Sequence, residues 1–148
     1  MEEIIYNKTL QLLKEHNIVL LFDDNFPIEE KGKYVRIHNQ KFIILKERLK
    51  PTFLKTFSLH HELSHAIHDD DLHIFNEIQQ SHKEFLANCQ AITEIIYLKA
   101  CEEGAPTKDI SALMEYVGVT GYEYYPVYKK IISRYYDSEG NPLSRWDF

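Results

Sequence analysis

The 148-residue sequence has only two cysteines, Cys89 and Cys101, and no long hydrophobic run. Two cysteines without CxxC spacing make neither a disulfide framework nor a complete thiolate metal site, so we expect two buried thiols. The apolar stretches are too short to span a bilayer, and the amino-terminal MEEIIYNKTLQ lacks the basic segment and apolar run of a secretory signal. We therefore expect a cytoplasmic protein that has no membrane partner.

Positive charge is also scarce. The chain has 17 lysines and arginines against 23 acidic residues, a formal net charge of -6, so direct binding to nucleic acid is not expected. Hydrophobic residues make up 44% of the chain and charged residues 27%, which is typical of a globular protein. The length is sufficient for one domain with its own hydrophobic core.

Hydrophobic periodicity and turn residues predict an α+β fold. The expected helices are 2–16, one that begins at Pro51-Thr52, 81–100, and two more after Thr107 that are separated by GVTG. The expected strands are 18–22, 33–37 and 41–46, and the last two flank a turn at 38–40. Together they predict a small three-stranded sheet packed on the helix that begins at Pro51, with additional helices.

That helix contains the stretch HHELSHAIHDD (60–70), which includes an HExxH motif at His61-Glu62-Leu63-Ser64-His65. On a helix, side chains at positions i and i+4 share one face, so both imidazoles can bind one zinc ion. The carboxylate of Glu62 would then take a proton from water during attack on a carbonyl. The motif predicts a zinc-dependent peptidase with His61 and His65 as metal ligands and Glu62 as the general base.

The helix around the motif has two different faces. At about 100° per residue, one stripe is apolar and the opposite stripe holds histidines: Leu59, Leu63, Ala66 and Ile67 against His61, His65 and His68. A solvated polar face would have the same pattern and is the alternative interpretation. Three histidines beside an acid favour a metal site.

A catalytic zinc ion needs a third protein ligand. His61 and His68 are separated by about 10 Å along the helix axis, which is too far for them to share an ion. The metzincin spacing HExxHxxGxxH would supply Asp71, but it places His68 where that pattern has glycine. Asp69, Asp70 and Glu77 are further reserve ligands.

Glu84 is the preferred third ligand. It shares a helix face with Asn88 and several apolar residues, and a carboxylate that faces a core needs a partner such as zinc. Asn88, one turn along, could support a ligand through a hydrogen bond. The competing interpretation is a capping box, Ser81-x-x-Glu84, in which Glu84 only caps its own helix.

The segments FSLHHELSHAIH and KEFLANCQA resemble the two metal-binding helices of the ImmA/IrrE family of metallopeptidases, approximately HELGH followed by a further histidine, and ExxANxFA. The resemblance covers roughly residues 5–100, with HNIVLLF as a first strand and GKYVRIHNQKFIILK as a hairpin. It implies a zincin-like fold of the gluzincin type, with His61, His65 and Glu84 as zinc ligands and Glu62 as the general base. It further implies supporting roles for His68 and Asn88. Ser64 stands where the family typically has glycine, and Gln90 where it has phenylalanine.

Proteins of this family cleave helix-turn-helix repressors, often those of phages or integrative elements. The resemblance therefore implies a zinc endopeptidase that acts as an antirepressor on a protein substrate. We expect strand 41–46 to lie at the sheet edge and to pair with an extended substrate segment. The alternative is a non-catalytic antirepressor that sequesters the repressor, with a structural metal or none. Residues 1–106 are expected to form the zincin-like core, and residues 107–148 a helical extension packed on the same domain.

Overall fold

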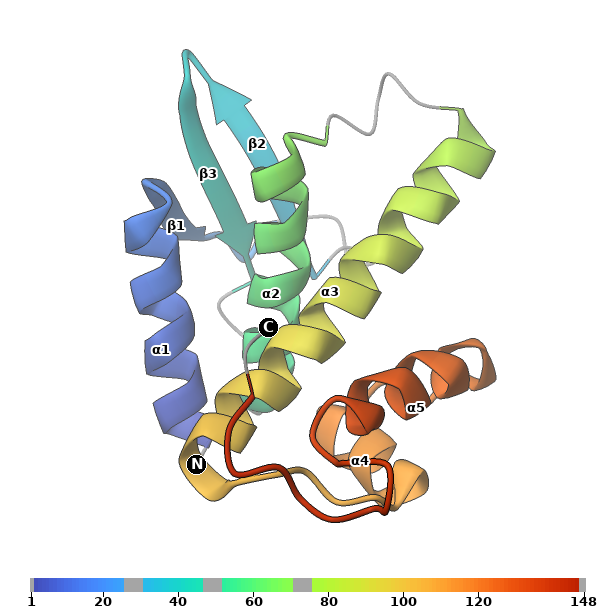
Figure 1. Cartoon of the computed structure of the whole chain (residues 1–148). Coiled ribbons are helices and arrows are strands. Elements are labelled where there is room, and N and C mark those ends of the chain that lie inside the picture. The colour runs from blue at the N-terminus through green and yellow to red at the C-terminus, as the bar shows by residue number, and fades with distance from the viewer. Residues whose placement is uncertain (1, 26–30, 47–51, 71–75, 147–148) are drawn as a thin grey trace. The chain divides into compact units, whose positions relative to one another are not determined.

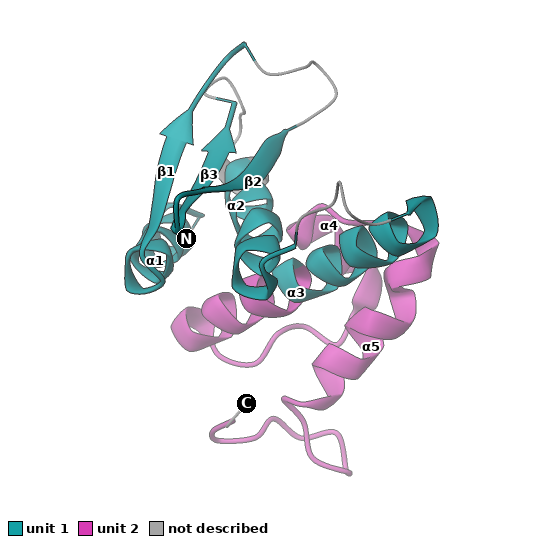
Figure 2. Cartoon of the chain, turned by 90° about the horizontal axis from the view of Figure 1, so that it is seen from above, with its two compact units in different colours: residues 1–91 teal, residues 92–148 magenta. Residues whose placement is uncertain are grey.

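The computed structural model describes residues 2–25, 31–46, 52–70 and 76–146 (Figure 1). The chain divides into two compact units, Met1–Ala91 and Ile92–Phe148, which Figure 2 colours separately. Helix α3 (Glu77–Glu103) contributes to both units. The domain boundary expected at residue 106 stays a prediction.

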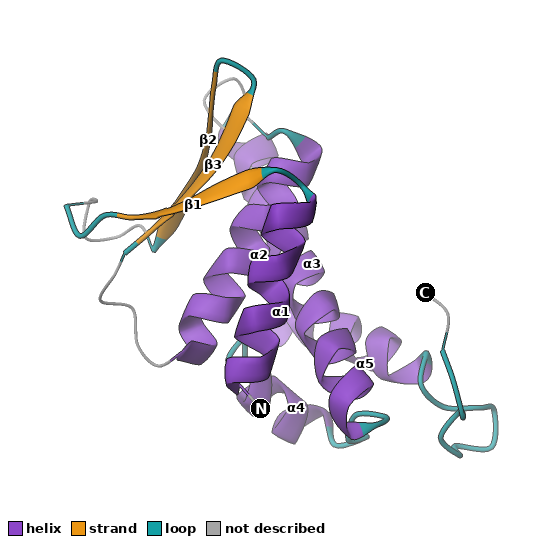
Figure 3. Cartoon of the chain, turned by 90° about the vertical axis from the view of Figure 1, so that its left-hand side faces the viewer, coloured by secondary structure: helices purple, strands orange, loops and turns teal. Residues whose placement is uncertain are grey.

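The first unit combines helices with a three-stranded mixed sheet, so the predicted α+β fold with a small three-stranded sheet is confirmed. The strands are β1 (Ile18–Phe22), β2 (Gly32–Ile37) and β3 (Gln40–Leu45). Helices α1 (Glu2–Glu15) and α2 (Thr52–His68) pack against one face of this sheet (Figure 3).

The buried side chains between these helices and the sheet explain the arrangement. In β3 they alternate, with Ile43 and Leu45 fully buried, which is the period-2 pattern of a strand with one face on a core. The cluster that they join is entirely apolar: Leu13, Ile18, Ile43, Leu45, Leu59, Leu63 and Ala66. Ile67, which the helical wheel assigned to the same stripe, is 47% exposed, so the core face of α2 is narrower than predicted.

The order of strands in the sheet is β1-β3-β2, and the expectation that residues 41–46 form an edge strand is wrong. β3 is central, because it pairs in parallel with β1 and antiparallel with β2. The stretch FIIL (42–45) within β3 is apolar on both faces and suits a central strand. β2 has two charged residues, Lys33 and Arg36, and charged residues are common on edges. The edges of the described sheet are therefore β1 and β2.

Residues with positive φ end these elements abruptly. The β2–β3 hairpin is closed by His38 (φ 49°) and Asn39 (φ 70°), the two positive values that a two-residue type I′ turn requires. Asn17 (φ 57°) ends α1 in the left-handed conformation that asparagine tolerates better than most residues. The hairpin predicted around residues 38–40 is thus present, with a shorter turn.

Helix α3 begins earlier than the predicted residue 81. The backbone N–H of Gln79 donates to Asn76 Oδ1 at 2.9 Å, and the N–H of Asn76 donates to Gln79 Oε1 at 3.0 Å. This reciprocal pair is a capping box with asparagine at the N-cap. Ser81 therefore lies inside the helix, and the interpretation of Ser81 and Glu84 as a capping box is wrong.

The second unit continues α3 and adds two shorter helices, α4 (Ile110–Val117) and α5 (Tyr125–Ser133), which confirms the two helices predicted after Thr107. Asp109 caps α4 by accepting a hydrogen bond from the Ala112 N–H. Cys101 is exposed, contrary to the expected pair of buried thiols. None of the described helices combines the length and hydrophobicity that a membrane span requires.

Candidate metal centre

Three predicted ligands converge within the first unit. His61 and His65 lie one turn apart on α2, and Glu84 reaches them from α3. Figure 1 shows the two helices as labelled ribbons. The two Glu84 oxygens lie 2.9 Å from His61 Nε2 and 2.9 Å from His65 Nε2, and the two Nε2 atoms are 3.2 Å apart. Ligand atoms around a tetrahedral zinc ion, with bonds of about 2.0–2.1 Å, are roughly 3.3 Å apart. The donor atoms therefore already have nearly the spacing that one zinc ion needs.

The protonation of the two imidazoles also favours a cation. Asn88 Oδ1 lies 2.7 Å from His61 Nδ1, and Asp70 Oδ2 lies 3.1 Å from His65 Nδ1. An amide oxygen and a carboxylate only accept hydrogen bonds, so both Nδ1 atoms carry the proton and donate it. Any such ring that is neutral directs the lone pair of Nε2 at the other ring and at Glu84. Such a set of acceptors repels itself unless protons or a cation lie between them.

The pKa values of the site follow from the same contacts. Burial alone would raise the pKa of Glu84, but the hydrogen bonds with His61 and His65 outweigh it and lower that pKa to about 2. Burial alone would lower the pKa of His65, but its hydrogen bonds with Glu84 and Asp70 outweigh it and raise that pKa. Glu84 is therefore ionised at neutral pH, as a metal ligand must be.

Glu62 is next to His61 in the sequence, and its side chain lies against strand β2. Its residue is 7% exposed, and burial raises the pKa of its carboxyl group, although the nearby His61 and His65 act in the opposite direction. The backbone N–H of Tyr34 in β2 donates a hydrogen bond to this carboxylate. A methyl group added at Gly32 would lie 3.3 Å from Glu62 Cγ, which shows how closely the backbone of β2 approaches the side chain.

The other predicted site residues have different surroundings. Asn88 holds His61, as described above, whereas His68 is exposed and donates from Nδ1 to the Ser64 carbonyl of its own helix at 2.8 Å. A supporting role for His68 stays a prediction. Glu77 is an exposed residue in the first turn of α3, and Asp71 lies outside the described residues. Among the described residues, the only histidine, cysteine and acidic side chains grouped closely enough to hold a metal ion are His61, His65 and Glu84.

Asp70 is the residue beside the site whose position sequence reasoning did not predict. It was a reserve ligand in an acidic run, but its carboxylate is buried against the far nitrogen of His65. Position 70 lies two residues beyond His68, the last residue of α2, and the direction in which a side chain points there depends on how the helix ends. The HExxH pattern does not encode that direction.

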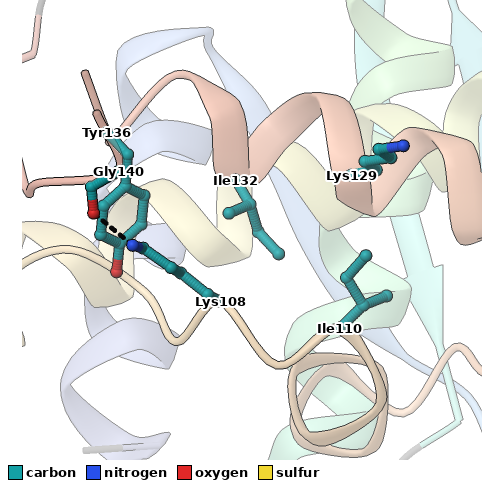
Figure 4. A pocket seen from close by; sticks show the side chains of 6 residues that line it. All are labelled: Lys108, Ile110, Lys129, Ile132, Tyr136 and Gly140. Carbon is teal, nitrogen blue, oxygen red and sulfur yellow. Dashed lines mark hydrogen bonds between the residues drawn. The ribbon is translucent and has the colours of Figure 1, made fainter. Parts of the chain in front are cut away.

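A separate pocket of about 250 Å³ lies in the second unit (Figure 4), lined by Lys108, Ile110, Lys129, Ile132, Tyr136 and Gly140. The Lys108 amine already donates to the Gly140 carbonyl and lies 4.6 Å from the centre of the Tyr136 ring. The pocket contains no acid, histidine or cysteine among its lining residues, so it does not match the chemistry predicted from the sequence.

The comparison with family models agrees with this geometry. The peptidase M78 model, described as the IrrE N-terminal-like domain, matches residues 13–121, which is more than half of the chain. The chain belongs to this family. No curated protein and no solved structure gives a significant match. Membership indicates a metallopeptidase with the zincin-like fold of the M78 family, which confirms the family and fold inferred from the two motifs.

Proposed function

We propose that the chain is a zinc-dependent endopeptidase that cleaves a helix-turn-helix repressor in the cytoplasm and so acts as an antirepressor. The observation that carries the proposal is the convergence of His61, His65 and Glu84 beside a buried Glu62, in a chain of the IrrE N-terminal-like family. Two imidazoles and one carboxylate are the ligand set of a catalytic zinc site that keeps one position open.

Each residue has a defined part in this reaction. His61, His65 and Glu84 would hold the ion, and Asn88 would fix the ring of His61 through its Nδ1 proton. Zinc at this site would polarise the scissile carbonyl and lower the pKa of water towards neutrality. Glu62 would take the proton of the attacking water and deliver it to the leaving amine. Its raised pKa suits this exchange, because a base works best when its pKa approaches the working pH.

The substrate strand is proposed to pair with β2 rather than with residues 41–46. β2 lies at the edge of the described sheet, and the contacts of Gly32 and Tyr34 place Glu62 directly against it. An extended peptide that adds to this edge would gain backbone hydrogen bonds and run past the proposed base. A substrate peptide that is methylated at alternate backbone nitrogens should therefore be cleaved with a lower kcat/KM than the unmethylated peptide. An unchanged kcat/KM would contradict the pairing of the substrate with β2.

The experiment that tests the function is cleavage by wild type and by Glu62→Gln. Purified helix-turn-helix repressors serve as candidate substrates, and a peptide library analysed by mass spectrometry serves as an unbiased one. Wild type should cleave, and Glu62→Gln should retain zinc but lose at least roughly 100-fold in rate, because the base is absent. Glu77→Gln, an exposed change in α3, is the matched control and should cleave normally.

Sequestration predicts a different pattern. The repressor would stay intact in a stable complex, and Glu62→Gln would relieve repression as well as wild type does. That outcome would replace the enzymatic proposal with the binding one.

A further inference from the structure

We propose that Asp70 is the positioning residue of this metal site, because it fixes the ring of His65 and couples the helix of the histidines to the helix of Glu84. The inference rests on the proposed metal site and extends it beyond the three ligands and the base.

The end of α2 brings Asp70 back to the site. Asp69 adopts φ 52°, and its N–H donates to the Ala66 carbonyl at 3.2 Å, while the N–H of Asp70 donates to the His65 carbonyl at 2.9 Å. These are the two hydrogen bonds of a Schellman motif, with aspartate in the left-handed position that glycine usually occupies. Asp70 therefore contacts His65 twice, through its backbone N–H and through the carboxylate that accepts the Nδ1 proton.

The turn itself is held from the sheet. Tyr34 Oη donates to Asp69 Oδ1 at 2.6 Å, and Arg36 Nη1 donates to the other oxygen of Asp69. Both residues belong to β2, the strand that also donates a backbone hydrogen bond to Glu62. The position of Asp70 is thus tied to the same strand that positions the proposed base.

The second oxygen of Asp70 faces α3. Lys83 Nζ lies 3.3 Å from Asp70 Oδ1, and Lys83 directly precedes Glu84, the ligand from α3. Because the Asp70 residue is only 9% exposed, a charged partner there is screened less than at the surface. One carboxylate therefore links a ligand on α2 with the residue next to a ligand on α3.

The two imidazoles have unequal outer partners. His61 Nδ1 donates to a neutral amide oxygen of Asn88, whereas His65 Nδ1 donates to a carboxylate. A carboxylate partner raises the basicity of the ring more than an amide does. Asp70 should therefore contribute more to metal retention than Asn88.

Two measurements test the role of Asp70. The first is zinc affinity by competition with a chromophoric chelator, for wild type, Asp70→Ala, Asp70→Asn and Asn88→Ala. Asp70→Ala should weaken zinc binding by roughly 10- to 100-fold, and Asn88→Ala by less. Asp70→Asn, which keeps a hydrogen-bond acceptor but not the charge, should fall between wild type and Asp70→Ala.

The second is the tautomer of His65 in metal-free protein, from ¹⁵N chemical shifts of the imidazole nitrogens. Wild type should carry the proton on Nδ1, and Asp70→Ala should shift it towards Nε2, while circular dichroism confirms that both proteins are folded. Lys83→Ala should keep the wild-type tautomer, since it leaves the His65 contact intact, and should reduce zinc affinity by less than Asp70→Ala does.

Wild-type zinc affinity together with a wild-type tautomer in folded Asp70→Ala would overturn the proposal. If wild type itself bound no zinc, the proposed metallopeptidase would be refuted. The metal-free tautomer measurement would then still decide whether Asp70 orients His65.

Discussion

Gly32 offers the sharpest test of how β2 fits against the site. A methyl group at this position would lie 2.6 Å from Leu45 Cδ2, 3.2 Å from the Ile44 carbonyl oxygen and 3.3 Å from Glu62 Cγ. Favourable carbon contacts lie at about 3.5–4.0 Å, so the first contact is roughly 1 Å too short. Leu45 is fully buried in the core, so its side chain cannot move aside into solvent.

The expected cost of Gly32→Ala follows from these contacts. Overpacking of a core by one methyl group typically costs about 1–3 kcal/mol. Replacing glycine by alanine also restricts the unfolded chain, which stabilises the protein by about 0.4–1 kcal/mol. We therefore expect a net loss of roughly 1–2 kcal/mol in the free energy of unfolding. We also expect lower peptidase activity, because Glu62 must shift.

The assay is urea denaturation, with Gly121→Ala as the matched control. Gly121 has φ -62°, and the three atoms nearest to a methyl group there are the carboxylate atoms of Glu123, an exposed side chain that can move. This variant should be as stable as wild type or slightly more so. In a Leu45→Val background, which removes the clashing atom, Gly32→Ala should cost about 1 kcal/mol less. Equal stabilities for Gly32→Ala and Gly121→Ala would refute the close packing of β2.

Three further outcomes are expected. His60 is buried, and burial lowers its pKa from 6.5 to about 4. Because the unfolded chain therefore binds a proton at a higher pH than the folded protein does, the free energy of unfolding falls as the pH falls. The loss should reach roughly 3 kcal/mol between pH 6.5 and pH 4, and the difference in urea unfolding between metal-free wild type and His60→Gln should show it. Lys41→Met removes the 2.6 Å hydrogen bond to the Ala66 carbonyl near the end of α2 and should cost about 1 kcal/mol by urea unfolding. Asp109→Ala removes the cap whose side chain accepts from the Ala112 N–H and should also cost about 1 kcal/mol, measured by thermal unfolding.

The elements that sequence reasoning predicted well are those with strong periodicity. The helix of the histidines was predicted because its apolar and polar stripes repeat every three to four residues. The strand limits 18–22 and the β2–β3 hairpin followed from short apolar runs and a turn. The ligand atoms of His61, His65 and Glu84 also lie together as expected.

The parts that were missed depend on contacts between distant segments. The hydrophobic pattern of a strand does not determine which other strand it pairs with, so the parallel pairing of β1 with β3 was not predicted. The start of α3 was misplaced because Ser81 and Glu84 match a capping box that the Asn76–Gln79 pair forms instead. The position of Asp70 depends on the left-handed conformation of Asp69. A glycine at that position would have predicted this helix end from the sequence, whereas an aspartate does not.

The most direct test of the three-ligand centre is zinc content, measured by plasma mass spectrometry after zinc reconstitution and desalting. Wild type and Glu77→Ala, a control at the exposed start of α3, should each retain about one zinc ion per chain, as one three-ligand site requires. Glu84→Ala should lose most of it. Zinc retained in full by Glu84→Ala, or absent from wild type, would contradict the account of His61, His65 and Glu84 as one metal site.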